Sequence, residues 1–320
     1  MNRKILITGG LGCLGSGMSL YLKNNSYDVL IGSRRNKYHK PKELQNCSLI
    51  KTDYNDLSSL DHACKNIDTI IHLAATNSQT SSENPRLAYQ VNFLGTKKLI
   101  NSAIKNNVRN FIYFSTAHVY GSSLNGNITE NSPLNYSTDY ASTHKMAEDY
   151  LLTKIASKEI FGTVFRLSNS VGLPLVKDAN CWDLFLNNIC IGAISQRKIK
   201  INSNPYIKKD FVQMEQVYRI VQSFIDNDYQ VNFPVFNIGS GKSRTLLETA
   251  KLVAKSCDRL FNFSPQITYQ KNFKTKNEEL PFEFNINKLQ SCTSLTVDSS
   301  ISQAIDKTLM FLHAEKNLIE

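Results

Sequence analysis

Residues 4–15 read KILITGGLGCLG, an apolar run followed at once by a glycine-rich turn. The run 4–8 has the pattern of a β-strand, and residues 13–23 have that of a helix. A glycine turn between a strand and a helix lets backbone N–H groups approach a pyrophosphate, to which the helix N-terminus adds partial positive charge. The stretch therefore predicts a dinucleotide site formed by Gly9, Gly12, Cys13, Leu14 and Gly15.

Strand and helix patterns alternate through the rest of the first half of the chain. Further strands are expected at 28–32, 48–51, 69–73, 110–115 and 162–167. Helices are expected at 57–65, 86–106 and 140–158. This alternation predicts an α/β fold with parallel βαβ units and helices on both faces, a doubly wound sheet of the Rossmann type.

The second half is less regular. It predicts helices at 182–194, 212–226, 246–256 and 299–312, a strand at 235–238, and a polar, irregular segment at 261–295. We expect residues 1–173 to form the dinucleotide-binding domain, completed by about 210–256. Residues 174–209 and 257–320 are then expected to form a smaller α/β substrate lobe.

Composition narrows the class of protein. Seven scattered cysteines without a C-x-x-C pair indicate a reduced, cytoplasmic compartment with no disulfide framework and no metal site. No run approaches the roughly 20 apolar residues of a membrane span. The net charge of +10 comes from lysines that are spread along the chain, with no basic run of interleaved aromatic residues. This distribution argues against nucleic acid as a ligand. The charge then reflects either a solvated lysine-rich surface or a pocket for an anionic substrate.

Further motifs follow the glycine turn in order. They are Asp53 after the third strand, His72-Leu73-Ala74-Ala75, Asn92, Arg166–Gly172 as R-x-x-N-x-x-G, Lys209-Asp210-Phe211 and Asn237–Gly241. Together with Gly9-x-x-Gly12-x-x-Gly15, this series resembles the extended (atypical) short-chain dehydrogenase/reductases, the epimerases, dehydratases and reductases of nucleotide sugars. The resemblance implies a nucleotide-sugar substrate, contacted by Asn169, and a homodimer formed through helices 86–106 and 140–158. It also implies cofactor contacts from Asp53, Tyr54, Leu73, Ala74, Ala75, Asn92 and Leu167.

The end of the second strand bears on the choice of dinucleotide. NAD-binding relatives usually carry an acidic residue at the position of Ser33, and here two arginines follow that small residue, Arg34 and Arg35. A guanidinium can bind a 2′-phosphate, whereas a carboxylate would repel it. We therefore expect NADP as the cofactor. The alternative is NAD, and Arg34 and Arg35 would then be solvated charges of the loop.

The resemblance also implies a catalytic set. Thr116 falls at the family's catalytic hydroxyl position, and Tyr140 and Glu148 match its Y-x-x-x-K-x-x-x-E pattern, but the residue at +4 is His144. On a helix the +4 residue turns about 40° from the tyrosine and the +5 residue about 140°. We therefore expect His144, and not Lys145, to lie beside Tyr140.

This departure affects the chemistry. The family lysine lowers the pKa of the tyrosine by its fixed charge. An imidazole carries a full charge only when it is protonated, and an ordinary imidazole titrates near neutral pH. Tyr140 is then either a weaker base or mainly a proton donor. His118, at a position where one branch of the family has an epimerisation acid/base, is either such a group or a structural loop histidine.

These residues predict an NAD(P)-dependent epimerase or 4-keto reductase that acts at C4 of a nucleotide-diphosphate sugar, with Tyr140 as the acid/base. Two alternatives stay open. One is a dehydrogenase for a non-sugar carbonyl compound, against which the charged segment 271–283 argues. The other is a catalytically weak NAD(P)-binding regulatory protein, for which the histidine at position 144 is the best support.

Overall fold

The computed structural model describes residues 3–34, 40–121, 124–227, 233–270 and 281–315. Its centre is a seven-stranded sheet in the order β11-β7-β5-β4-β1-β2-β3, in which every neighbouring pair is parallel. The strands are β1 (Lys4–Thr8), β2 (Asp28–Ser33), β3 (Ser48–Lys51), β4 (Thr69–His72), β5 (Asn110–Thr116), β7 (Phe161–Leu167) and β11 (Val235–Ile238). The predicted Rossmann-type sheet is confirmed, and its strand order reverses between β1 and β4, where such sheets bind ligands.

Helices cover both faces because the strands alternate their side chains. Ile5 and Ile7 of β1 pack with α1 (Cys13–Asn24) and α8 (Met214–Asp226) on one face. Leu6 packs on the other face with α2 (Leu57–Cys64), α5 (Thr96–Lys105) and α6 (Asp139–Ala156). These two apolar layers hold the carboxyl ends of the strands at one edge of the sheet.

The helix expected at 86–106 is not regular. The chain forms α3 (Ser78–Glu83), α4 (Pro85–Ala88) and a π-helical stretch Tyr89–Gly95 before α5. Asn92 is buried in the π-helical stretch, where its Oδ1 accepts from the Thr76 N–H at 2.8 Å and its Nδ2 donates to Thr143 at 3.1 Å. The irregular turn thus ties the loop after β4 to α6.

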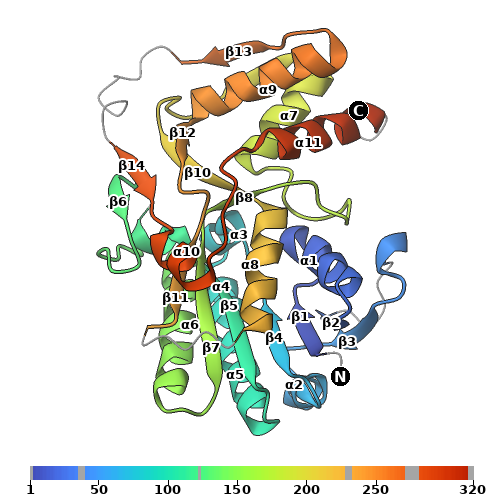
Figure 1. Cartoon of the computed structure of the whole chain (residues 1–320), viewed down its shortest axis with the longest axis vertical. Coiled ribbons are helices and arrows are strands. Elements are labelled where there is room, and N and C mark those ends of the chain that lie inside the picture. Colours follow the sequence, from blue (N-terminus) through green and yellow to red (C-terminus); the bar gives the residue numbers. More distant parts are fainter. Residues whose placement is uncertain (1–2, 35–39, 122–123, 228–232, 271–280, 316–320) are drawn as a thin grey trace.

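A second core lies beyond the sheet. It packs α7 (Phe185–Gln196), α9 (Leu246–Phe261) and α11 (Ser302–Ala314) together, seen above the sheet in Figure 1. The accompanying short strands are β8 (Asn169–Val171), β9 (Lys198–Ile201), β10 (Lys208–Gln213), β12 (Ser243–Thr245) and β13 (Gln266–Tyr269). Strands β6 (Gly126–Ile128) and β14 (Phe282–Phe284) form a separate parallel pair.

Several expectations for this half were wrong. The segment 261–295 was expected to be irregular, but its described parts, 261–270 and 281–295, contain β13, β14 and α10 (Asn287–Thr293). The helix expected from residue 212 begins at Met214, because Phe211 and Val212 extend β10 and pair with β8. Helix α7 begins at Phe185 rather than at residue 182. In the part of the chain that the structure describes, no helix has the length and apolar character to cross a bilayer.

Candidate active site

The glycine turn after β1 has no room for a side chain at Gly9 or Gly15. Gly9 has a φ of +70°, and a Cβ there would lie 2.8 Å from the backbone nitrogen of Ala74. A Cβ on Gly15 would lie 2.2 Å from the Gly9 carbonyl oxygen. Helix α1 begins at Cys13 with no side-chain cap from Gly12 and no acidic residue in its first turn. This cradle suits a pyrophosphate, since its backbone N–H groups are the available donors.

The other residues predicted to hold a cofactor gather around this turn at the carboxyl ends of the strands. Ser33 ends β2, Asp53 and Tyr54 follow β3, Leu73, Ala74 and Ala75 follow β4, and Leu167 ends β7.

Not all of these side chains are equally available. Asp53 forms an ion pair with Lys51 at 3.4 Å, and the Tyr54 ring packs against Gly95 in the core. Asn92 is hydrogen-bonded within the protein, as described above. Arg34 is exposed, whereas Arg35 lies outside the described residues.

The predicted catalytic residues meet at the carboxyl end of β5. Tyr140 and His144 lie on one face of α6, with ring centroids 4.6 Å apart, and the His118 ring is 5.8 Å from that of Tyr140. Thr116 ends β5, and its hydroxyl accepts from the His118 N–H at 3.2 Å. Burial raises the pKa of Tyr140, and a hydrogen bond with Thr116 partly offsets that rise. Tyr140 is therefore protonated at neutral pH.

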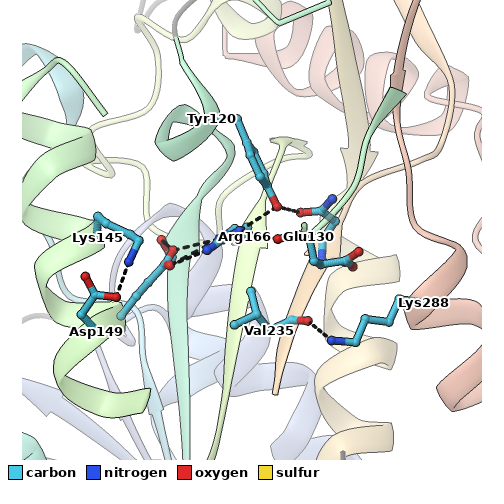
Figure 2. Close-up of polar contacts among 10 residues, drawn as sticks. Tyr120, Glu130, Lys145, Asp149, Arg166, Val235 and Lys288 are labelled. Carbon is cyan, nitrogen blue, oxygen red and sulfur yellow. Dashed lines mark hydrogen bonds and ion pairs between the residues drawn. The ribbon is translucent and has the colours of Figure 1, made fainter. Parts of the chain in front are cut away.

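His144 differs from the expectation of a group that titrates near neutrality. Burial, and secondarily the charge of His118, lower the pKa of His144 to about 3. Its Nδ1 lies 2.8 Å from the Tyr113 hydroxyl. Lys145 pairs with Asp149 one turn along α6, as Figure 2 shows, so the helix places it away from Tyr140 as its spacing predicts. No cation on α6 therefore takes the place of the family lysine.

A buried polar frame holds α6 against the sheet. Arg166 of β7 forms an ion pair with Glu148 of α6 at 2.9 Å. It also donates to the Tyr120 hydroxyl at 2.9 Å (Figure 2). Ser115 donates to the same Glu148 carboxylate. Sequence reasoning assigned no role to Arg166, although it quoted the residue within a motif. Arg166 is buried and helps to hold α6 against the sheet. Its position in an apolar strand pattern could have indicated this burial.

A pocket opens beside this cluster. Its wall includes His118, Asn169, Lys209 and Asp210, with Leu167 and Phe284 among its apolar members. The Asn169 amide donates to the Asp210 carbonyl at 2.8 Å. The pKa of Lys209 is lowered by burial, and no carboxylate of the described residues pairs with its ammonium group. The sequence analysis quoted Lys209 within the motif Lys209-Asp210-Phe211 but assigned no role to this lysine.

The described residues fit a bound dinucleotide. Besides the glycine cradle, three buried polar atoms of this region have no hydrogen-bond partner among the described residues. They are Ser16 Oγ in the first turn of α1, the Tyr54 hydroxyl after β3, and His144 Nε2. Unpaired buried polar atoms are uncommon and cost free energy unless a ligand or water completes them. No cluster of metal-ligating side chains occurs in the described ranges.

The chain is similar to known proteins in both sequence and fold. A family model described as "NAD dependent epimerase/dehydratase family" matches residues 5–239. The UDP-glucose 4-epimerase of Mycoplasma genitalium is 25% identical, with coverage of 79% of this chain and 81% of that protein. The dTDP-glucose 4,6-dehydratase of Streptomyces niveus is 24% identical, with coverage of 79% and 77%. The structure of UDP-glucose 4-epimerase from Bifidobacterium longum with NAD+ and UDP superposes with a TM-score of 0.81 at 19% identity, covering 98% of this chain and 99% of that one.

Proposed function

The chain belongs to the NAD-dependent epimerase/dehydratase family, and from that premise we propose that it acts at C4 of a nucleotide-diphosphate sugar as an epimerase or a 4-keto reductase. The observation that carries the proposal is the convergence of Tyr140, Thr116 and His144 on one strand end, beside a pocket that contains Lys209. Convergent polar groups in one concave site are the usual mark of a reaction centre.

The cofactor side of the proposal rests on the glycine cradle. The nicotinamide, when bound, supplies or removes the hydride. Gly9, Gly12 and Gly15 would lie against the pyrophosphate, and the exposed Arg34 would bind a 2′-phosphate. We therefore propose NADP as the preferred dinucleotide, with NAD as the alternative. The solved relative from Bifidobacterium longum holds NAD+.

The chain's own chemistry centres on Tyr140. Thr116 would hold the sugar oxygen by a hydrogen bond while the carbonyl forms or disappears. In reduction Tyr140 gives its proton to that oxygen, and in oxidation it removes one. Because burial raises the pKa of Tyr140, reduction is the direction in which it begins in the required protonation state.

The substrate side rests on the charge of the pocket. Lys209 presents a half-buried ammonium group without a carboxylate partner among the described residues, which suits the diphosphate of a sugar nucleotide. Asn169 lines the same pocket and would contact the sugar.

A second candidate is a regulatory protein that binds the cofactor and turns over slowly. The neutral His144 favours it, because Tyr140 then has no neighbouring cation to activate it as a base.

We also propose that the protein is a homodimer that associates through α5 and α6. Helix α6 carries exposed apolar residues such as Met146. Light scattering of the purified protein tests the oligomeric state.

The test is to incubate the protein with UDP-, dTDP-, GDP- and CDP-hexoses and their 4-keto derivatives in the presence of NADPH or NADH. Conversion of each compound is monitored by NMR and by absorbance at the nicotinamide band. Conversion by wild type and a loss of about 100-fold or more in Tyr140→Phe, with cofactor affinity retained, supports an enzyme. Tight cofactor binding with no conversion of any member by wild type overturns it in favour of the regulatory protein.

His118 separates an epimerase that works beside the carbonyl from a simple reductase. Solvent deuterium should enter the carbon next to the carbonyl in wild type and not in His118→Ala, if His118 is the acid/base of that exchange. Equal deuterium incorporation in both proteins makes His118 a structural residue. The pKa of His118 is lowered by burial and by Lys209, so it begins as a neutral base.

A further inference from the structure

Tyr113 is a buried group beside the site that the proposed reaction does not use. Tyr113 lies in β5, is 2% exposed, and stacks on His72 with ring centroids 5.7 Å apart. Its hydroxyl is 2.8 Å from His144 Nδ1, whereas His144 Nε2 is buried with no partner. The two nitrogens of one imidazole therefore have different environments, and Tyr113 makes the difference.

The proton of this hydrogen bond can be assigned from chemistry. Burial raises the pKa of Tyr113 well above its usual range and lowers that of His144, so a neutral phenol meets a neutral imidazole. No other acceptor for the Tyr113 hydroxyl is found among the described residues, so an Nδ1–H donor would leave the phenolic proton unpaired. Tyr113 O–H therefore donates to Nδ1, and the imidazole proton is on Nε2.

The neighbouring histidine follows the same logic. The Thr96 hydroxyl donates to the Asn92 carbonyl at 2.7 Å, so it accepts from His72 Nε2 at 2.7 Å, and His72 Nδ1 accepts from Thr8 at 2.5 Å. Burial lowers the pKa of His72 to about 3. Both histidines of the cluster are thus neutral Nε2–H tautomers, each fixed by a hydroxyl on its Nδ1.

We propose that Tyr113 is a positioning residue that fixes His144 as the neutral Nε2–H tautomer and so presents an uncharged hydrogen-bond donor, in place of an ammonium group, beside Tyr140. The cofactor's ribose hydroxyls are the acceptors that this donor fits. The proposal rests on the proposed function for its meaning, because a donor without charge leaves Tyr140 protonated and suits a site that gives a proton to a carbonyl. Its physical content, the tautomer and its hydrogen bond, is independent of the substrate.

The first test reads the tautomer by NMR. Imidazole ¹⁵N shifts of the ¹⁵N-histidine-labelled protein, with His144 assigned through His144→Gln, should show Nε2 protonated and Nδ1 unprotonated from pH 5 to 8. The groups that face His144 are His118, His72, Tyr113, Tyr140 and the paired Glu148, so His118→Gln is measured as well to separate its titration. A protonated Nδ1, or titration of His144 near neutrality, overturns the proposal.

The second test uses a matched pair of variants. Tyr113→Phe should turn His144 into a tautomer mixture and weaken NADPH or NADH binding about three- to tenfold, the range for one lost neutral hydrogen bond. Tyr27→Phe removes a phenol that donates to Asp226 at the amino end of β2, and should change neither property. Unchanged tautomer and affinity in Tyr113→Phe overturn the proposal.

A rescue variant separates positioning from simple packing. In Tyr113→Phe/His144→Lys the ammonium group needs no tautomer partner, so cofactor affinity should return to within about twofold of His144→Lys alone. An equal loss in both backgrounds means that Tyr113 acts through packing, which overturns the positioning role. All of these readings use NMR and cofactor binding, so a protein that converts no nucleotide sugar can still confirm or refute the Tyr113–His144 pair.

Discussion

The glycine turn after β1 and the polar cluster at the start of α6 serve one site and are built in opposite ways. In the turn the backbone is the functional part, and a single Cβ on Gly15 would overlap the Gly9 carbonyl oxygen. In the cluster, side chains make the contacts: the Tyr113 hydroxyl of β5 is within hydrogen-bond range of the His144 imidazole of α6, whose ring also packs on that of Tyr140. At Gly9 and Gly15 the backbone leaves no space for a Cβ, whereas a site made of side chains can change its chemistry by substitution.

That difference bears on how each part can be substituted. A replacement at Gly9 or Gly15 meets main-chain atoms that cannot move cheaply. Where the sequence resemblance implies a lysine, the chain has His144, whose Nδ1 lies 2.8 Å from the Tyr113 hydroxyl. A side-chain cluster can accept such a replacement when a neighbour supplies the missing partner.

The largest loss of stability should come from breaking the buried ion pair between Arg166 and Glu148, which holds α6 against the sheet. Arg166→Met leaves the buried Glu148 carboxylate without a cationic partner, and should lower the free energy of unfolding by about 3–5 kcal/mol. Urea denaturation measures this change. Lys145→Met breaks the more exposed ion pair on the same helix and should have little effect. Similar losses in both variants would mean that the buried pair is not the support of α6.

The backbone site should fail next. Gly15→Ala forces main-chain movement at the turn, and should cost about 1–3 kcal/mol in stability and lose most of the cofactor affinity. Gly12→Ala meets only the Gly9 carbonyl, at 3.1 Å, so its stability loss should be smaller while its cofactor affinity still falls. Thermal unfolding with and without NADPH separates the two effects. Equal thermal stability of the two variants would contradict the difference in packing.

Acid should weaken the side-chain cluster. The folded-state pKa values of His72 and His144, about 3, lie below the unfolded value, so between about pH 6.5 and 3 the unfolded chain binds more protons and stability falls as pH falls. At pH 5 each histidine should cost about 2 kcal/mol relative to pH 7. His144→Gln should reduce that slope in urea titrations, whereas His62→Gln, at an exposed position, should not. A wild-type slope retained in His144→Gln would show that His144 charges freely.

The smallest effect concerns cofactor choice at the edge of the backbone site. Arg34→Ala should weaken NADPH binding about tenfold and leave NADH binding unchanged, because a charge-assisted hydrogen bond to the 2′-phosphate is lost. Lys255→Ala, an exposed cation on α9, is the control for net charge. An equal loss for both cofactors would remove the argument for NADP.

Prediction from sequence succeeded where signals are local. The strands β1, β4, β5 and β11 were expected within one residue of their ends, because buried parallel strands read as short apolar runs between turn residues. It failed for the segment 261–295, where β13 and β14 are held by pairing with β9 and β6, strands far away in the chain. The helix register that places His144 beside Tyr140 was also predicted, since it follows from helical geometry alone.

The sequence by itself determined the parallel sheet, the glycine cradle and the face of α6 that carries Tyr140 and His144, because each depends on residues adjacent in the chain or one helical turn apart. Only the tertiary structure decided the charge of His144. Its neutrality comes from burial and, secondarily, from the charge of His118, which lies on a different element. The same holds for Lys209, whose place in the pocket depends on the packing of β10 beside β8. Desolvation is a property of everything packed around a group, and no local pattern contains it.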